Sequence, residues 1–234
     1  MPKIQIQKRK PIVISIGGSL VVPNGGPDAI FLKKLDDLIS EKVKKGGKFV
    51  LVVGGGKTAR HYLEAAKKIH KVTPEDLDWL GIHATRLNGH LLRTIFRKFA
   101  HPVVIKNPLR MPKIWKGKIL VAAGWKPGWS TDYVACRIAK RLGVKTVVNA
   151  SNIDHVYESD PEKNPKAKKF DALSWTEYRK IVGDKWDPGL SAPFDPVASK
   201  FSQKNNIEVA VVSGKIENLR NVLEERDFRG TVLK

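Results

Sequence analysis

The sequence of 234 residues contains a single cysteine, Cys136. One thiol excludes an internal disulfide framework and any zinc site built from several cysteines. No apolar stretch approaches the roughly 18 residues that a membrane-spanning helix needs. Basic residues 8–10 followed by apolar residues 12–22 have the outline of a signal peptide, but glycines interrupt the apolar run and no small-residue cleavage pattern follows it. We therefore expect a cytoplasmic protein with no membrane partner.

Acidic residues are scarce relative to basic ones: 43 lysines and arginines face 23 aspartates and glutamates, a net charge of +20. This excess predicts attraction to polyanions such as nucleotides, nucleic acids or acidic surfaces. No recognition motif and no array of basic and aromatic residues accompanies the charge, so we expect no specific nucleic-acid partner. The 41% of hydrophobic and 28% of charged residues are typical of a globular protein, which excludes a disordered chain.

Short runs rich in β-branched residues alternate with longer helical patterns along the chain. Strands are predicted at residues 12–16, 49–53, 103–105, 119–122, 146–149, 209–212 and 230–233, the last at a sheet edge. Helices are predicted from a cap at Asp28 to residue 43, at 57–69, from 74 to about 99, from a Thr131-Asp132 cap to Gly143, and at 195–205. Such alternation predicts the α/β fold class, with a mostly parallel sheet covered by helices on both faces.

Two glycine-rich loops each follow a predicted strand, at residues 17–19 and 54–56. The second is not a P-loop, because Leu51 occupies the position of its first glycine, and not a dinucleotide motif, because its last position is Ala59. Glycine has no Cβ, so backbone N–H groups can close on an anion, and a helix that begins there favours negative charge. Loops after adjacent parallel strands would form two neighbouring anion sites, enough for two phosphorylated ligands.

Seven blocks of sequence, in chain order, carry a family resemblance. They are ISIGGSL (14–20), VGGGKTAR (53–60), DWLGIHATRLN (78–88), GWKPGWSTDYVA (124–135), SNIDHVYESDP (151–161), FDPVASK (194–200) and GTV (230–232). Together they resemble the archaeal-type uridylate (UMP) kinases of the amino acid kinase superfamily. The resemblance implies a single-domain, three-layer α/β/α sandwich, usually hexameric, that transfers phosphate from ATP to UMP with Mg²⁺. It also implies a phosphate-acceptor side at about residues 1–140 and an ATP side at about 141–234.

Carried over position by position, the resemblance implies a site for two nucleotides. The ATP phosphates would be held by Gly18, Ser19, Gly56 and Arg60, and the adenine nucleotide would be framed by Ser151, Tyr157 and Asp160. UMP would be held by Gly55, by Asp78, and by the loop residues Trp125, Lys126, Pro127, Gly128, Trp129, Ser130 and Thr131. The two tryptophans have two interpretations, because they could stack on the base or only pack the loop.

The residue types fit phosphoryl transfer without reference to any family. A nucleotide phosphate is already anionic at neutral pH, so its attack needs no general base, and catalysis consists of positioning and charge cancellation. Lys57, Arg60 and Mg²⁺ would supply positive charge. Asp132 and Asp154 would orient the water shell of the metal or a cationic side chain.

Two positions depart from the pattern of the superfamily. Ser15 stands where many members have lysine on the first strand, and Asn152 stands where many bacterial relatives have lysine. The identity of the transition-state cation is therefore open among Lys57, Arg60 and the metal.

Arg86, Arg93 and Arg97 fall at helical spacing, and a solvated helix face is expected there.

Two alternative functions stay open at the level of sequence. One is another phosphotransferase of the superfamily, such as a kinase for isopentenyl phosphate. The other is a degenerate, non-catalytic binder of a nucleotide or oxyanion, which Ser15 and Asn152 favour. The carboxylates of Asp132, Asp154 and Asp160 favour an enzyme instead.

Overall fold

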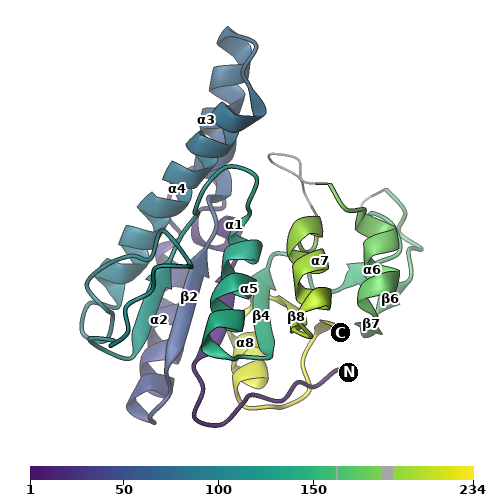
Figure 1. Ribbon diagram of the computed structural model, residues 1–234. Helices are drawn as coiled ribbons and strands as arrows, with labels where there is room; N and C mark the ends of the chain where they lie inside the picture. The colour runs from purple at the N-terminus through teal and green to yellow at the C-terminus, as the bar shows by residue number, and fades with distance from the viewer. Residues whose placement is uncertain (162, 186–191) are drawn as a thin grey trace.

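A seven-stranded sheet forms the middle layer of the protein (Figure 1). Its strands are β1 (Ile12–Ile16), β2 (Phe49–Val53), β3 (Ile119–Ala122), β4 (Thr146–Ser151), β7 (Ala172–Leu173), β8 (Glu208–Ser213) and β9 (Gly230–Leu233). Their order is β3-β2-β1-β4-β8-β9-β7, and neighbouring strands are parallel except for β8 and β9. A separate antiparallel pair is formed by β5 (Val156–Tyr157) and β6 (Lys169–Phe170). The structure is a computed structural model, and it describes residues 1–161, 163–185 and 192–234.

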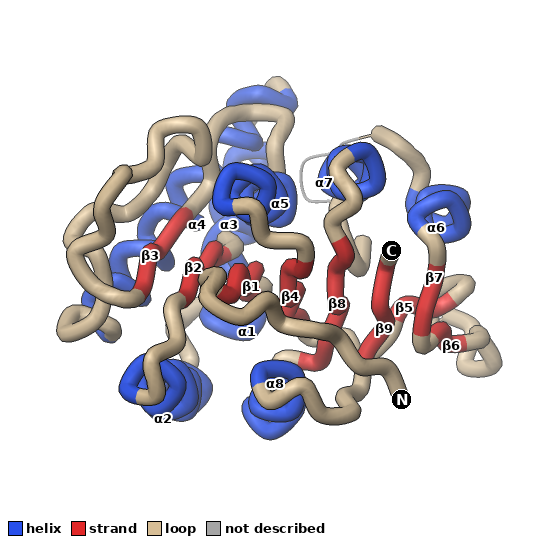
Figure 2. Tube along the Cα trace, turned by 60° about the horizontal axis from the view of Figure 1, so that its bottom comes forward, coloured by secondary structure: helices blue, strands red, loops and turns tan. Residues whose placement is uncertain are grey.

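Helices cover both faces of the sheet (Figure 2). They are α1 (Gly18–Val21), α2 (Ala29–Lys44), α3 (Gly56–Ile69), α4 (Pro74–Ile95), α5 (Thr131–Leu142), α6 (Trp175–Val182), α7 (Pro196–Lys204) and α8 (Ile216–Leu223). One hydrophobic core lies between the sheet and α1, α2, α8 and the C-terminal half of α4, and a second lies between the sheet and α5, α6 and α7. The predicted α/β class and the three-layer α/β/α arrangement are thereby confirmed.

The alternation of side chains along β1 assigns its residues to the two cores. Ile14 and Ile16 pack in the core beneath α2, whereas Val13 packs in the core beneath α5. Successive side chains of a strand point to opposite faces, so Ser15 shares the α5 face with Val13. A buried hydroxyl therefore faces the start of α5, and this placement matters for the site.

Several helices begin at a residue whose side chain caps the first turn. Asp28 accepts a hydrogen bond from the backbone N–H of Phe31, and Asp195 accepts one from that of Ala198. Such caps satisfy N–H groups that have no partner within the helix. At the other end of α5, Gly143 adopts a left-handed φ of +66°, which a glycine reaches without strain.

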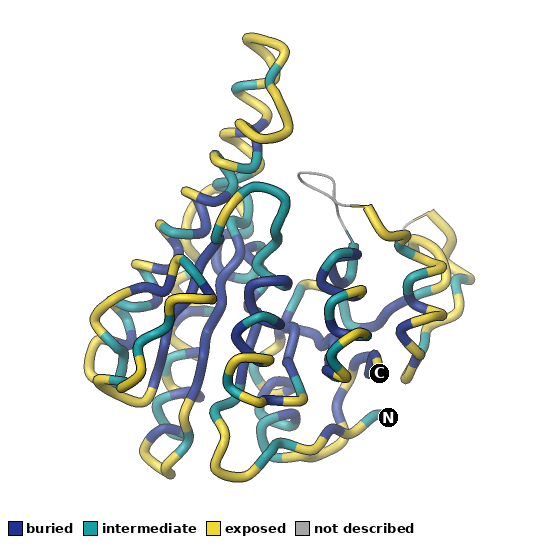
Figure 3. Tube along the Cα trace, viewed as in Figure 1, coloured by how far each residue is buried: buried dark blue, intermediate teal, exposed yellow. Residues whose placement is uncertain are grey.

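Helices α3 and α4 form a pair that extends beyond the sheet (Figure 1). Figure 3 shows that the outer part of this pair is mostly exposed, in contrast to the buried strands. No described helix is long and apolar enough to cross a membrane.

Four local expectations were wrong. Residues 103–105 form no strand, and only Ile105 makes an isolated bridge to Ala122. Strand β9 lies between β8 and β7 instead of at an edge, because the two-residue β7 covers it. Ser130, not Thr131-Asp132, caps α5 by accepting the N–H of Tyr133. The loop at residues 17–19 is already the start of the short helix α1.

Candidate active site

Two glycine-rich turns meet at the carboxyl ends of β1 and β2. The strands are parallel with Ile16 opposite Val53, so the residues that follow them start side by side. A Cβ atom on Gly18 would lie 2.0 Å from the Gly56 nitrogen, and one on Gly56, whose φ is +64°, would lie 2.3 Å from the Gly18 oxygen. The two backbones can touch only because both residues lack a Cβ. Residues 17–19 and 54–56 together are called the glycine cradle below.

The glycine cradle is also the N-terminal end of two helices. Helix α1 begins at Gly18 and α3 at Gly56, and neither helix has a side-chain cap. Backbone N–H groups at an uncapped helix start, aided by the helix dipole, attract anions. Because two such starts adjoin, the cradle can bind two anionic groups next to each other.

Two cations border the glycine cradle. Arg60, on the first turns of α3, donates from Nη2 to the Ser19 hydroxyl at 3.2 Å and so links the two turns. Its side chain is exposed, while Lys57 in the same helix is partly buried. Among the described residues, neither cation forms an ion pair with a carboxylate. Both charges are therefore available to a phosphate in the cradle.

Helix α4 connects the glycine cradle to the loop at residues 123–132. Asn88 donates from Nδ2 to the Gly54 and Gly55 oxygens at 2.8 and 3.2 Å, which fixes the second glycine turn. On the same helix, Asp78 Oδ2 accepts the N–H of Gly128 at 2.7 Å. The predicted UMP residues Gly55, Asp78 and 125–131 are thus brought together around α4.

Sequence reasoning missed the roles of Thr85 and Asn88, and its expectation for Arg86 was wrong. The Thr85 hydroxyl accepts the N–H of Gly124 at 2.8 Å, and Arg86 donates to the Trp125 oxygen at 3.0 Å. Arg86 is partly buried instead of lying on a solvated face, and this burial lowers its pKa. Its guanidinium satisfies loop carbonyls, which accounts for the burial. Thr85 and Asn88 are three residues apart and so lie on the same side of the helix, which also packs inward. Buried polar side chains need hydrogen-bond partners, and this spacing is the signal that could have identified them.

The tryptophans of the loop pack on their own neighbours. The rings of Trp125 and Trp129 are 6.0 Å apart at 28°, and the ring of Trp129 lies 4.1 Å from that of Tyr133 on α5. Lys126 places its ammonium 4.8 Å from the centre of the Trp125 ring. The rings thus pack the loop in this structure, and stacking on the base of UMP stays a prediction.

A buried group of oxygen atoms lies on the α5 face of β1. The Ser15 hydroxyl donates to Asp132 Oδ1 at 2.8 Å, and the backbone N–H of Asp195 donates to Asp132 Oδ2 at 3.4 Å. Asp195 is only 5% exposed, and its Oδ2 has no hydrogen-bond partner among the described residues. Asp132 and Asp195 are called the carboxylate pair below. Neither of them takes part in an ion pair within the described chain.

The carboxylate pair is shifted toward its protonated form. Burial raises the pKa of Asp132, although the hydrogen bonds from Ser15 and Asp195 oppose this. Burial also raises the pKa of Asp195 to about 7, opposed by the N–H of Ala198 and reinforced by the charge of Asp132. Two carboxylates that share a buried site without a cation cannot both ionise cheaply. The Ser15 hydroxyl gives this pair a hydrogen bond but no positive charge.

The residues predicted to frame the adenine nucleotide lie at the end of β4 and on the segment that follows it. Ser151 adjoins the cradle, since a Cβ on Gly17 would lie 3.4 Å from the Ser151 Cα. Tyr157 donates from its hydroxyl to Asp154 Oδ1 at 3.0 Å. Burial opposes the ionisation of Asp154, but the bond from Tyr157 and the nearby His155 outweigh it and lower the pKa. Asp160 is exposed on the turn after β5. Ser151 therefore joins the cradle, while Asp154 and Tyr157 form their own hydrogen-bonded unit.

Comparisons with known proteins agree with this geometry. The sequence profile described as "Amino acid kinase family" matches residues 10–213. A uridylate kinase from Pyrococcus abyssi is 38% identical over 214 residues, which cover 89% of this chain and 92% of the relative. A uridylate kinase from Thermococcus sibiricus is 36% identical over 208 residues, 86% of this chain and 89% of the relative.

Solved structures of the same kind share the fold. The crystal structure of uridylate kinase from Archaeoglobus fulgidus has a TM-score of 0.79 at 29% identity, covering 96% of this chain and 100% of that one. The structure of UMP kinase from Ureaplasma parvum has a TM-score of 0.76 at 22% identity, covering 97% and 100%. The second likeness concerns the fold alone.

Proposed function

This chain belongs to the amino acid kinase family, and we propose that it is a UMP kinase, which transfers the γ-phosphoryl group of ATP to UMP and forms ADP and UDP. The contact between the two glycine turns carries the proposal. With a Cβ on Gly18 only 2.0 Å from the Gly56 nitrogen, two helix starts lie at one place, as a phosphate donor and a phosphate acceptor require. The names of the relatives support uridylate as the acceptor.

The transfer itself needs few protein groups. An oxygen of the UMP phosphate attacks the γ-phosphorus, and the bond from that phosphorus to the β–γ bridging oxygen breaks, leaving its electron pair on ADP. The attacking oxygen is already anionic, so no side chain has to remove a proton. Arg60 and Lys57, beside the backbone N–H groups of the cradle, cancel the charge that spreads over the transferred group.

Each nucleotide has a proposed set of residues. The ATP phosphates lie on Gly18, Ser19, Gly56 and Arg60, with Ser151, Tyr157 and Asp160 along the adenine nucleotide. UMP lies on Gly55, Asp78 and the loop 125–131. The hydrogen bond from Gly128 to Asp78 supports this assignment, because it holds the loop against the helix that also fixes Gly55. On this proposal the acceptor side is about residues 1–140 and the ATP side about 141–234.

Mg²⁺ enters this proposal with ATP, whose phosphates are its main ligands. The carboxylate pair fits a cation nearby, because the buried Asp195 Oδ2 has no partner in the described chain. The ion supplies charge neutralisation on the phosphates when it is bound. Asp132 would orient water molecules in the hydration shell of the ion. Asp154 would orient water molecules of that shell from the ATP side.

Assembly and location complete the proposal. Tyr62, Ile69 and Leu87, on the α3–α4 pair, are 63%, 72% and 64% exposed, and such apolar side chains favour burial against another copy of the chain. We expect a homo-oligomer, a hexamer by family resemblance, in the cytoplasm. Light scattering after gel filtration gives the number of subunits.

An acceptor panel tests the proposed reaction. Purified protein is incubated with ATP, Mg²⁺ and either UMP, CMP, dUMP, AMP or isopentenyl phosphate, and the release of ADP is followed. We expect release with UMP to exceed release with every other acceptor. Turnover with isopentenyl phosphate above UMP would assign the other phosphotransferase, and UMP binding without any turnover would assign a degenerate binder.

A further inference from the structure

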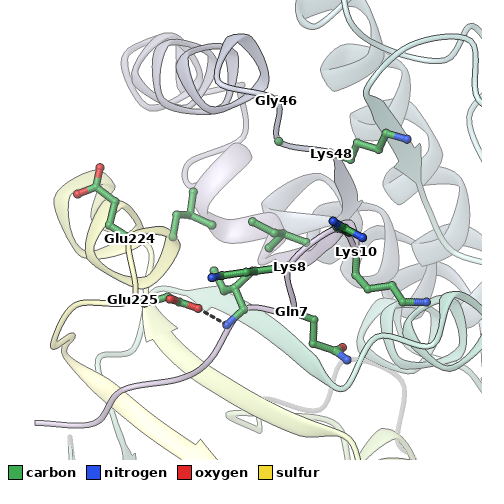
Figure 4. A pocket seen from close by; sticks show the side chains of 12 residues that line it. Gln7, Lys8, Lys10, Gly46, Lys48, Glu224 and Glu225 are labelled. Carbon is green, nitrogen blue, oxygen red and sulfur yellow. Dashed lines mark hydrogen bonds between the residues drawn. The ribbon is translucent and has the colours of Figure 1, made fainter.

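A cavity of about 410 Å³ opens at the end of the sheet opposite the glycine cradle. It is lined by the N-terminal residues 6–10, by the turn at 46–48 between α2 and β2, and by residues 223–225 at the end of α8 (Figure 4). Ile12, the first residue of β1, lies at its wall, whereas the cradle follows Ile16, the last. Five strand residues span roughly 16 Å, so the cavity is distinct from the candidate active site.

The charges around this cavity are unbalanced. Lys8, Arg9 and Lys48 are exposed, and none of them forms an ion pair among the described residues. Of the two carboxylates in the wall, only Glu224 is neutralised by ion pairs among the described residues. Glu224 pairs with Lys42 at 2.5 Å and with Arg226 at 2.9 Å, and Glu225 accepts the backbone N–H of Ile6 at 2.6 Å. Four basic side chains, those of Lys8, Arg9, Lys10 and Lys48, therefore line the cavity against one unneutralised carboxylate, and an excess of positive charge remains there.

Backbone strain is concentrated at the same place. Arg9 has a φ of +66° and Glu225 a φ of +55°. Within the described chain, Asn206 is the only other non-glycine residue with a positive φ. The left-handed region is unfavourable for residues with long side chains, and asparagine tolerates it better. Glu225 directly follows Glu224, the C-cap of α8, and a left-handed residue at that position is a common way to end a helix. The excess of positive charge is therefore the feature that points to a ligand at this cavity.

We propose that this cavity binds a polyphosphate chain, either inorganic or esterified to a nucleoside, through Lys8, Arg9 and Lys48. Several linked phosphates balance three separate cations, which a single phosphate dianion does not. The partly buried Ile12 and Leu223 give the cavity an apolar wall on which a nucleoside can rest. The site is additional to the one that performs phosphoryl transfer, and its existence does not depend on that activity.

Amide hydrogen exchange with tripolyphosphate as the probe tests the proposal, because it locates binding along the chain. We expect slower exchange at residues 8–10 and 46–48. The variant Lys8→Gln/Arg9→Gln/Lys48→Gln should weaken tripolyphosphate binding at this site about tenfold or more. Its activity with ATP and UMP should remain, which also shows that it is folded. The single variant Lys48→Gln should give a smaller loss in the same direction.

The matched control removes the same charge elsewhere. Lys67→Gln/Lys68→Gln/Lys71→Gln changes three exposed lysines at the far end of α3 and beyond it, and should leave the exchange pattern unchanged. A second arm with ATP as the probe separates the sources. Slowing at 8–10 with ATP alone assigns the esterified form, and slowing with both probes assigns the phosphate chain itself. No slowing at these amides with either probe, or an equal loss in both triple variants, would overturn the proposal.

Discussion

The glycine cradle and the carboxylate pair adjoin the same strand, yet they are built on opposite principles. The cradle consists of backbone that meets backbone, and Gly18 belongs to it because it has no side chain. The pair consists of side chains from α5 and α7, joined to β1 by the Ser15 hydroxyl. Activity should therefore fall when an atom is added to the cradle. Stability and its pH dependence should change when a charge or a hydrogen bond is removed from the pair. This difference determines which variants report on each region.

Gly18→Ala should have the largest effect. Its Cβ would lie 2.0 Å from the Gly56 nitrogen, which is backbone and cannot move without displacing the start of α3. We expect kcat/KM for UMP to fall about 10³-fold, because both anion sites shift. Stability should fall by about 1–3 kcal/mol, measured by urea unfolding.

Gly81→Ala is the matched control, with the same change at a position where no atom lies within 4 Å of the new Cβ. Gly81 lies inside α4, so alanine should stabilise the protein by up to about 1 kcal/mol and leave kcat/KM unchanged. An active Gly18→Ala protein would show that the cradle does not hold the reacting phosphates.

Arg60→Ala should have the second largest effect, because it removes the cation that spans the two turns. We expect kcat/KM to fall about 10²-fold, as for the loss of one charged donor at a transition state. Stability should not change, because the side chain is exposed. Arg97→Ala, at an exposed position after the end of α4, makes the same chemical change and should leave the rate unaltered. Equal rates for both variants would assign the transition-state charge to Lys57 or the metal.

The cradle could be predicted from the sequence because its signal is local. A buried strand, a run of glycines and a helix start follow one another within about ten residues, and two copies of the pattern imply two adjacent loops. Capping boxes are equally local: Ser174 and Glu177 cap α6 reciprocally, and their spacing would have predicted this missed helix. The strand β7 has only two residues and therefore no periodicity to detect. Because β7 could not be predicted, the position of β9 between β8 and β7 could not be predicted either.

The carboxylate pair could not be predicted, because its members meet only in the folded protein. Asp132 and Asp195 are 63 residues apart, and Ser15 lies another 117 residues before Asp132. The sequence shows only that Ser15 stands where many members of the superfamily have a lysine. In the structure it is a hydrogen-bond donor to a carboxylate whose pKa burial raises.

Asp195→Asn should stabilise the protein at alkaline pH. Burial raises the pKa of Asp195 from 3.8 to about 7, so between these values the folded protein retains a proton that the unfolded chain has released. Stability from this group is thus lost as pH rises. Asparagine removes the charge and still caps α7, so we expect a gain of about 2 kcal/mol at pH 8 and little change at pH 4.

Thermal unfolding in a chelator, without nucleotide, gives this pH dependence. Asp28→Asn is the control, because Asp28 caps α2 in the same way at a less buried position. A loss of stability in Asp195→Asn at every pH would contradict the charged, buried pair and indicate a capping role alone.

Ser15→Ala should have the smallest effect and gives the sharpest test of the pair. The Ser15 hydroxyl stabilises the ionised form of Asp132 and so opposes the rise of its pKa. Its removal should cost about 1 kcal/mol at alkaline pH, and the cost should fall as the pH is lowered and the carboxyl group takes up a proton. Ser199→Ala removes an equally buried hydroxyl that donates at 2.7 Å to the neutral carbonyl oxygen of Asp195. Its cost should not vary with pH, because its acceptor does not titrate. Parallel pH profiles for the two variants would mean that Ser15 serves packing only. A divergence that grows as the pH rises would identify Ser15 as the donor that stabilises the ionised form of Asp132.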